Sequence, residues 1–221
     1  MSTQRPLLPA PLALGKADTL LFIGDSITDC GQREDPQRLG SGFVRMVHHH
    51  LTAADPTDAP NVLNHGHGGN TVLDLADRWD QHVLATAPSV LSVKIGVNDV
   101  WRQLDGKSRG VPVDEYTQVY ADLLEQTRQA LPDVKLVLCE PTVIDSPPQP
   151  PGGNQLMGSY VDAVHRLAER FAAHLVPMFT AFTDATRARP DLDWTTDGVH
   201  PTQLGHTLLA QTWLRATNTD S

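Results

Sequence analysis

The chain lacks both the set of cysteines that cross-links a small extracellular fold and the apolar segments that anchor a protein in a membrane. It has only 2 cysteines, Cys30 and Cys139, among its 221 residues, so a disulfide framework is excluded and a reducing compartment fits. No apolar run is long enough to cross a bilayer. Prolines also interrupt residues 1–15, where a signal peptide would need an unbroken apolar core. These absences predict a cytoplasmic protein without a membrane partner.

Basic residues are scarce relative to acidic ones. The chain has 17 lysines and arginines against 26 aspartates and glutamates, a formal net charge of −9. This balance argues against a nucleic acid as the main partner. With 40% hydrophobic residues, the chain can bury a sizeable core, and its length suits one α/β domain. We therefore expect a single domain over residues 1–221, in which 1–16 form an N-terminal extension.

Strand-like apolar runs alternate with helical segments along the chain. Strands are predicted at 19–23, 61–64, 90–95, 134–139 and 174–178, the last of them edge-like. Helices are predicted at 42–51, after a cap at Thr71, at 113–131, at 155–172, and from Pro201 at its first turn. This alternation is typical of an α/β protein with three layers, α/β/α, and a parallel sheet of roughly five strands. The proline-rich segment 145–153 is predicted to be a loop near the site.

The most informative motif follows the first predicted strand. The apolar run 19–23 leads directly into Gly-Asp-Ser-Ile-Thr at 24–28, which places Ser26 just beyond the end of a buried strand. In a parallel sheet, ligands bind just outside the carboxyl ends of the strands. Near the other end of the chain, Asp197 and His200 stand three residues apart. A histidine can take the proton of a serine nucleophile, and a carboxylate can orient the ring and stabilise its cation.

Two further segments complete a pattern. Residues 64–71 read Asn-His-Gly-His-Gly-Gly-Asn-Thr, and residues 96–99 read Gly-Val-Asn-Asp. Taken in order with the serine and histidine segments, they resemble the GDSL, or SGNH, family of serine esterases. The resemblance implies a flavodoxin-like SGNH-hydrolase fold and a catalytic triad of Ser26, Asp197 and His200. It also implies an oxyanion hole made by the backbone N–H of Ser26, the backbone N–H of Gly69 (with Gly68 as the neighbouring alternative) and the side-chain amide of Asn98.

The extended motifs at 22–31, 69–75 and 96–103 are similar to the bacterial acetylxylan esterase branch of that family. Members of this branch remove acetyl groups from xylan or its oligosaccharides, so the resemblance implies a short-chain acetylesterase acting on a small-molecule or oligosaccharide ester. A lipid or thioester substrate for the same machinery is the alternative within the family. A carbohydrate-binding protein without activity is the alternative outside it, and the complete set of triad and oxyanion positions argues against that. The oligomeric state is left open, and a homo-oligomer is compatible with the sequence.

Three residues beside the motifs are candidates for contact with the substrate. Trp101 could stack on a sugar ring, although tryptophan is equally common in cores, and Arg102 could donate hydrogen bonds to hydroxyl groups. Asp25 is the third candidate. Because Asp25 and Asp99 each neighbour a proposed catalytic group, they are also expected to secure the local loops by hydrogen bonds.

The remaining motifs carry less weight. Residues 106–110 match Gly-x-Ser-x-Gly around Ser108, but that elbow needs a strand before it and a helix after it, and neither is predicted there. Trp101 and Thr71 stand where a phosphate loop and a dinucleotide loop would each need a glycine, so no cofactor is implied. The histidines at 48–50 point in different directions on a helix, and those at 65 and 67 are expected to be structural, so no metal is implied. Cys30 is expected to be a small buried side chain and Cys139 a core residue.

Overall fold

The computed structural model describes residues 10–106, 109–145, 147–217 and 219. Its centre is a five-stranded sheet in which every neighbouring pair of strands is parallel, in the order β2-β1-β3-β4-β5. The strands are β1 (Thr19–Gly24), β2 (Asn61–Gly66), β3 (Val90–Lys94), β4 (Lys135–Cys139) and β5 (His174–Val176). The predicted α/β class and the flavodoxin-like strand order are confirmed.

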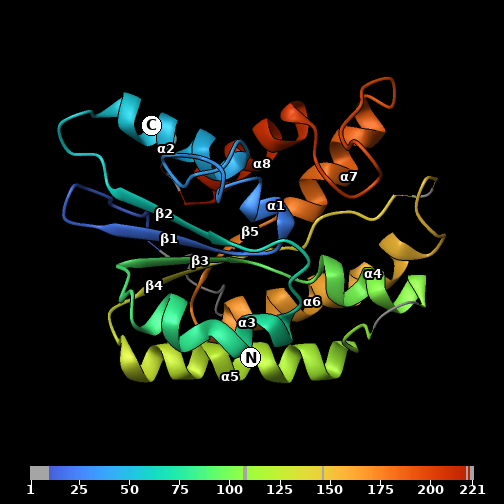
Figure 1. Cartoon of the computed structure of the whole chain (residues 1–221), viewed down its shortest axis with the longest axis horizontal. Helices are drawn as coiled ribbons and strands as arrows, with labels where there is room; N and C mark the ends of the chain where they lie inside the picture. The colour runs from blue at the N-terminus through green and yellow to red at the C-terminus, as the bar shows by residue number, and fades with distance from the viewer. Residues whose placement is uncertain (1–9, 107–108, 146, 218, 220–221) are drawn as a thin grey trace, which may run out of the picture.

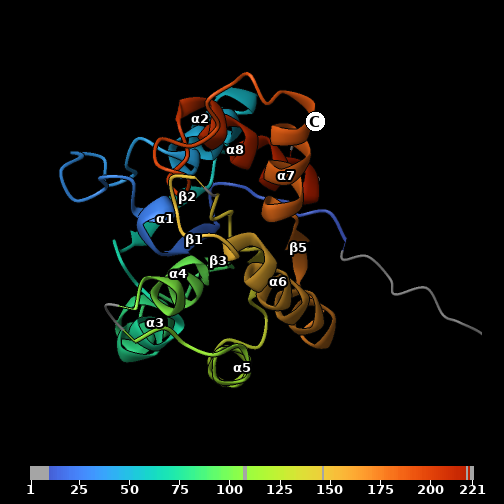
Figure 2. The same ribbon diagram turned by 90° about the vertical axis from the view of Figure 1, so that its right-hand side faces the viewer.

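Helices cover both faces of this sheet, as the two views in Figures 1 and 2 show. One face carries α2 (Phe43–Ala54), α7 (Met178–Ala188) and α8 (Gln203–Thr217). The other carries α3 (Val72–Trp79), α4 (Val97–Asp105), α5 (Val113–Ala130) and α6 (Gly153–Arg170). A short helix, α1 (Ser26–Asp29), follows β1 directly, and a π-helical turn, η1 (Asp80–Leu84), continues α3. The helices of each layer therefore bury their apolar sides against one face of the sheet.

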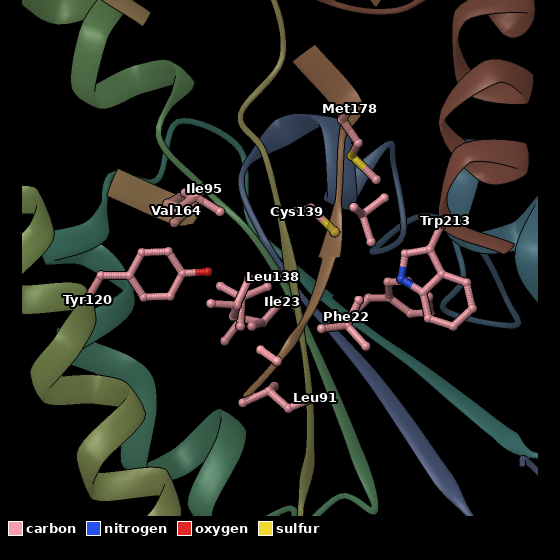
Figure 3. Close-up of a cluster of buried hydrophobic side chains, with 14 of the residues drawn as sticks. Phe22, Ile23, Leu91, Ile95, Tyr120, Leu138, Cys139, Val164, Met178 and Trp213 are labelled. Carbon is pink, nitrogen blue, oxygen red and sulfur yellow. The ribbon is translucent and has the colours of Figure 1, made fainter. Parts of the chain in front are cut away.

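The core lies on both sides of the strands because a sheet covered on both faces buries every side chain of its central strands. Residues 90–94 of β3 are all buried. Figure 3 shows Trp213 of α8 on one side of the sheet and Tyr120 of α5 on the other. The Trp213 ring lies 5.3 Å, centroid to centroid, from Phe22 of β1, and its indole N–H donates to Ser92 Oγ at 3.0 Å. The buried indole therefore keeps a hydrogen-bond partner inside an otherwise apolar layer.

The strand order determines where the motif segments meet. The chain runs from β1 outward to β2 and then crosses to β3 on the other side of β1, which is the switch point where ligands bind in such sheets. In the register of the sheet, Gly24 lies opposite both Gly66 and Lys94. Three adjacent strands thus end at one level, and the segments that follow them carry Ser26, Gly69 and Asn98.

Several boundaries differ from the prediction. Pro201 does not open the last helix, because it forms an isolated antiparallel bridge with Thr195, and α8 begins at Gln203. The hydroxyl of Thr202 instead accepts the backbone N–H of Gly205 at 3.2 Å, which is the cap that such a helix start needs. The sequence analysis also missed α4 and α7. In the expected extension 1–16, residues 1–9 lie outside the described part of the chain, but Leu12 is buried and its N–H donates to the carbonyl of Thr217 at 3.0 Å.

Candidate active site

Ser26 is the first residue of α1 and lies where β1 ends. Its neighbour Asp25 has extended backbone geometry and accepts the N–H of Ile27 at 3.0 Å, which caps the short helix and turns the chain sharply after the strand. The Ser26 side chain is half-buried, and its Oγ lies 3.0 Å from Nε2 of His200. A serine at this distance from an imidazole nitrogen can transfer its proton to the ring.

The segment 195–201 holds the histidine in place. Nδ1 of His200 lies 2.7 Å from Oδ2 of Asp197, while Oδ1 of the same carboxylate accepts the backbone N–H groups of His200 at 2.8 Å and Val199 at 3.0 Å. Gly198 between them has φ of +85°, a left-handed conformation that glycine adopts without strain. One carboxylate therefore fixes both the loop and the ring. Because Asp197 faces Nδ1, the Nε2 atom is directed at Ser26.

The Asp197 carboxylate is held in its charged form. Partial burial works against ionisation, but the hydrogen bonds from the backbone of His200, the ring of His200 and the backbone of Val199 outweigh it, so the pKa of Asp197 lies below its ordinary value.

The proline-rich segment 145–153 contacts the same loop from outside, as predicted for a loop near the site. Gln149 Nε2 donates to the Asp197 carbonyl at 2.7 Å, and the Asp145 N–H donates to the Gly198 carbonyl at 2.8 Å. Ser146 of that segment lies outside the described residues.

The two segments predicted to stabilise an oxyanion are joined to each other by a hydrogen bond. The side-chain amide of Asn98, which is 7% exposed, donates one hydrogen bond to the carbonyl of Asn70 at 3.0 Å. An amide nitrogen has two donors, so the second remains for another acceptor. The N–H of Gly68 donates to Oδ2 of Asp29 at 3.1 Å and is therefore occupied. This contact favours Gly69 over Gly68 as the backbone donor.

Asp25 does not have the surface that a contact with substrate would require. It is 0% exposed, and its carboxylate oxygens lie 3.1 and 3.2 Å from Nζ of Lys94, which is 1% exposed. Burial lowers the pKa of Lys94, and the neighbouring Asp25 opposes that fall. The expectation that Asp25 binds substrate is therefore wrong, because a buried ammonium and the N–H of Ile27 take up its oxygens. Its contacts match the other expected role, that of securing the turn after β1.

Trp101 and Arg102 on α4 flank the site in different ways. The Trp101 ring is half-buried and stands edge-to-face against the His200 ring, with centroids 6.2 Å apart. Arg102 Nη2 donates to the Gly69 carbonyl at 2.5 Å, and its Nη1 lies 3.9 Å from a carboxylate oxygen of Asp74. Trp101 thus lies next to the imidazole of His200, in a position where its ring can contact a substrate bound there. Arg102 holds the peptide that follows Gly69, the candidate backbone donor.

Asp99 secures the adjoining loop, as expected. Its Oδ1 accepts the N–H of Val72 at the start of α3 at 3.0 Å. Burial raises the pKa of Asp99 to about 7, although the Val72 hydrogen bond opposes the rise. Among the described residues, its Oδ2 has no hydrogen-bond partner. Asp99 thus links α4 to α3 directly beside Asn98.

Two important residues were missed by the sequence analysis. Lys94 stands in the apolar run of β3, and a charge inside a buried strand signals a buried partner. Arg78 on α3 donates to Asn70 Oδ1 at 2.8 Å, the His65 carbonyl at 2.9 Å and the Gly24 carbonyl at 3.1 Å. Arg78 therefore ties the end of β1 to β2 and to the oxyanion segment. No local sequence pattern marks it, because its partners come from three different segments.

The competing candidates gain no support from the described residues. Ser108 lies outside the described residues, and the helix α4 precedes Gly106, where a nucleophile elbow would need a strand. Within the part of the chain that the structure describes, no group of three or more metal-ligating side chains converges. Both cysteines are free; Cys139 is buried, whereas Cys30 is partly exposed, contrary to expectation, and its Sγ lies 3.4 Å from His206 Nε2. No helix among the described residues could span a membrane.

Comparison with known proteins gives one consistent result. A family model described as the GDSL-like Lipase/Acylhydrolase family matches residues 22–208. The chain is 37% identical over 214 residues to an acetylxylan esterase of Geobacillus stearothermophilus, covering 92% of this chain and 95% of the relative.

Solved structures of the Geobacillus enzyme resemble the present fold. One is a catalytic mutant of Axe2, an acetylxylan esterase, in which a serine is replaced by alanine, with a TM-score of 0.82 at 34% identity. Another is a catalytic mutant in which an aspartate is replaced by alanine, with a TM-score of 0.81 at 34% identity. Each comparison covers 93% of this chain and 96% of the other.

Proposed function

The chain belongs to the GDSL-like lipase/acylhydrolase family and is a carboxylic ester hydrolase, and from this premise we propose that Ser26, His200 and Asp197 are its catalytic triad. The observation that carries the proposal is the continuous hydrogen-bonded chain from Ser26 Oγ through His200 to Asp197, at 3.0 and 2.7 Å. Two solved structures of the related esterase are described as catalytic mutants, one with a serine and one with an aspartate replaced by alanine, which supports a serine and an aspartate in the chemistry here.

The reaction proceeds in two steps. Ser26 attacks the ester carbonyl while Nε2 of His200 takes the hydroxyl proton, and Asp197 stabilises the resulting imidazolium through Nδ1. The tetrahedral intermediate collapses as His200 gives that proton to the leaving alcohol. Water then attacks the acyl-enzyme with the help of His200 and releases the acid, which restores Ser26. Every proton transfer in this sequence passes through one ring nitrogen, because Asp197 occupies the other.

The negative charge that develops on the carbonyl oxygen needs preorganised donors. In this proposal they are the backbone N–H of Ser26 at the start of α1, the backbone N–H of Gly69 and the second amide hydrogen of Asn98. Three contacts keep these donors in place: Asn98 to the Asn70 carbonyl, Arg102 to the Gly69 carbonyl, and Asp29 to the Gly68 N–H. Because the donors are fixed before the reaction, little reorganisation is required in the transition state.

The proposed substrates are acetyl esters of sugars, with xylan-derived oligosaccharides as the leading class. The Geobacillus relative, whose match covers 92% of this chain, is an acetylxylan esterase. Trp101 beside His200 offers an aromatic face or edge to a sugar ring. Such a substrate is a small molecule or oligosaccharide. A reducing compartment, the cytoplasm, fits the two free cysteines.

A substrate panel tests this proposal. Purified enzyme is given aryl esters of acetyl, butyryl and octanoyl groups, acetylated xylo-oligosaccharides, other acetylated sugars and an acyl thioester. We expect the highest kcat/KM on acetyl esters and turnover of the acetylated xylo-oligosaccharides. A preference for octanoyl esters or thioesters would instead establish the lipid or thioester alternative. Absence of hydrolysis on every member would favour a binding protein without activity.

A further inference from the structure

A cavity of about 460 Å³ lies along the outer edge of β2, beside the oxyanion segment. The loop after α1 and the end of α3 close it from the sides. Six of the side chains that line it are basic: Arg33, Arg38, Arg78, His65, His67 and His82. Among the described residues that line it, none is an aspartate or a glutamate. Its size is typical of a ligand pocket, and we call it the arginine pocket.

The arginines of this pocket lack acidic partners. Within the described part of the chain, no carboxylate oxygen lies within 4.0 Å of the guanidinium nitrogens of Arg33, Arg38 or Arg78. Arg38 donates to the Arg33 carbonyl at 2.9 Å, and Arg33 Nη2 lies 2.7 Å from His67 Nδ1. The chain as a whole is acidic, with a formal net charge of −9. Asp29 and Asp74 act on Arg78 from a distance, but among the described residues no carboxylate pairs directly with the three guanidinium groups, so positive charge is concentrated in the pocket.

Arg78 is the most enclosed of the three. Burial lowers its pKa to about 10, so its guanidinium has lost much of its contact with water while it remains charged at neutral pH. Its hydrogen bonds to Asn70, the His65 carbonyl and the Gly24 carbonyl use three of its five N–H donors. Burial and the nearby Arg33 and Arg78 also lower the pKa of His67. An anion in the pocket would relieve this repulsion.

Two residues that line the pocket are hydrogen-bonded to the segment that leads into Ser26. The backbone N–H of His67 and the guanidinium of Arg78 both donate to the Gly24 carbonyl, two residues before Ser26. His67 is also two residues before Gly69. A single extended ligand could therefore fill the pocket while its ester reaches Ser26.

We propose that the arginine pocket binds a carboxylate carried by the sugar part of the ester, so that the preferred substrates are acetylated oligosaccharides bearing a uronic acid. This inference rests on the proposed function. A guanidinium pairs with a carboxylate through two parallel hydrogen bonds, and charge-assisted hydrogen bonds of this kind are stronger than neutral ones. The amides of Gln32 and Gln37, which also line the pocket, match the hydroxyl groups of the same sugar.

A kinetic comparison tests the pocket. The kcat/KM values are measured for an acetylated xylo-oligosaccharide and for the same oligosaccharide carrying a glucuronic acid substituent. We expect the charged substrate to be preferred by about tenfold or more, as one charge-assisted hydrogen bond would give. In the double variant Arg33→Gln/Arg38→Gln this ratio should fall toward one. Arg187→Gln, which removes an arginine on α7 that pairs with Asp184, is the matched control and should keep the wild-type ratio.

Binding to an inactive protein separates the pocket from the chemistry. Ser26→Ala protein is titrated calorimetrically with the deacetylated charged oligosaccharide, its neutral counterpart and inorganic phosphate. Tighter binding of the charged sugar than of the other two supports the inference. Equal binding of charged and neutral sugars would overturn it, as would phosphate binding as tightly as the charged sugar. If the wild type hydrolysed no ester at all, the proposed function would fail, whereas hydrolysis without preference for the charged sugar would reject the pocket alone.

Discussion

The ammonium of Lys94 and the carboxylate of Asp25, the residue before Ser26, form a buried ion pair with N–O distances of 3.1 and 3.2 Å. Lys94 comes from β3, whereas Asp25 caps α1 and precedes Ser26. The pair therefore joins two neighbouring strands at the level where the site begins. Neither side chain is exposed to water, so each charge depends on the other for its stabilisation.

Removing one partner of this pair should be strongly destabilising. Asp25→Ala leaves the Lys94 charge buried without a counterion and also removes the cap of α1, so we expect a loss of about 3–5 kcal/mol in the free energy of unfolding. Urea denaturation followed by circular dichroism measures it. Asp184→Ala, which breaks the exposed pair with Arg187, should leave that free energy nearly unchanged. Similar losses in the two variants would contradict the buried-pair argument.

Replacement of the proposed nucleophile should abolish turnover without unfolding the protein. Ser26→Ala removes the atom that attacks the ester, so aryl acetate hydrolysis should fall to background. A serine-directed fluorophosphonate should label Ser26, as peptide mass spectrometry would show. Ser108→Ala is the control and should retain activity, and labelling of Ser108 would refute the assignment.

Loss of the Asn98 amide should affect the transition state more than substrate binding. Asn98→Ala removes one proposed oxyanion donor, so kcat should fall by roughly 10²–10³, about 2.7–4 kcal/mol, with little change in KM. Steady-state kinetics on an aryl acetate measures both constants. Asn61→Ala removes an exposed amide at the opposite end of the sheet and should change neither. An unchanged kcat in Asn98→Ala would mean that its free N–H points away from the reacting carbonyl.

The role of Trp101 can be decided by comparing two substrates. If its ring contacts the sugar, Trp101→Ala should lower kcat/KM more for an acetylated xylo-oligosaccharide than for an aryl acetate. Trp101→Phe keeps an aromatic ring and should recover part of the loss on the sugar ester. Equal losses on both substrates would indicate that Trp101 acts by packing against His200, 6.2 Å away between ring centroids.

Asp99 should make stability depend on pH. Its pKa is raised from 3.8 to about 7 by burial, so between these values the folded protein keeps a proton that the unfolded chain has lost. Stability from this group is complete below about pH 4 and is lost as pH rises through 7, by up to about 4 kcal/mol. Asp99→Asn removes the titration, so its free energy of unfolding should increase relative to the wild type from pH 4 to pH 8. Urea denaturation at both pH values measures the difference, and parallel profiles would contradict it.

Candidate site residues could be proposed from the sequence more readily than the residues that support them. Ser26 and the Asp197–His200 pair stood out because each lies in a short contiguous motif next to a recognisable strand end or loop. The choice between Gly68 and Gly69 could not be made, because it depends on a contact of the Gly68 N–H with Asp29, 39 residues away. A local sequence motif does not predict a hydrogen bond between residues that are so far apart along the chain.

The errors have the same origin. A proline fits the first turn of a helix as well as an irregular bridge, and what excludes the helix at Pro201 is its pairing with Thr195. Asp25 is polar and adjacent to the nucleophile, so it is a reasonable substrate contact until Lys94 is found beside it. The helix α4 was missed although it directly follows Gly96, because its residues also carry the site motif.

Ser26 and His200, the proposed nucleophile and its base, are 174 residues apart, and His200 lies on a loop that follows every strand of the described sheet. Closing so long a chain segment is entropically costly, and contacts this distant in sequence slow folding. A chain in which the sheet has formed but this loop has not docked would have Ser26 and the Asn98 amide but no base. Under the proposed mechanism, recovery of esterase activity during refolding therefore reports the docking of the loop that carries His200 beside Ser26.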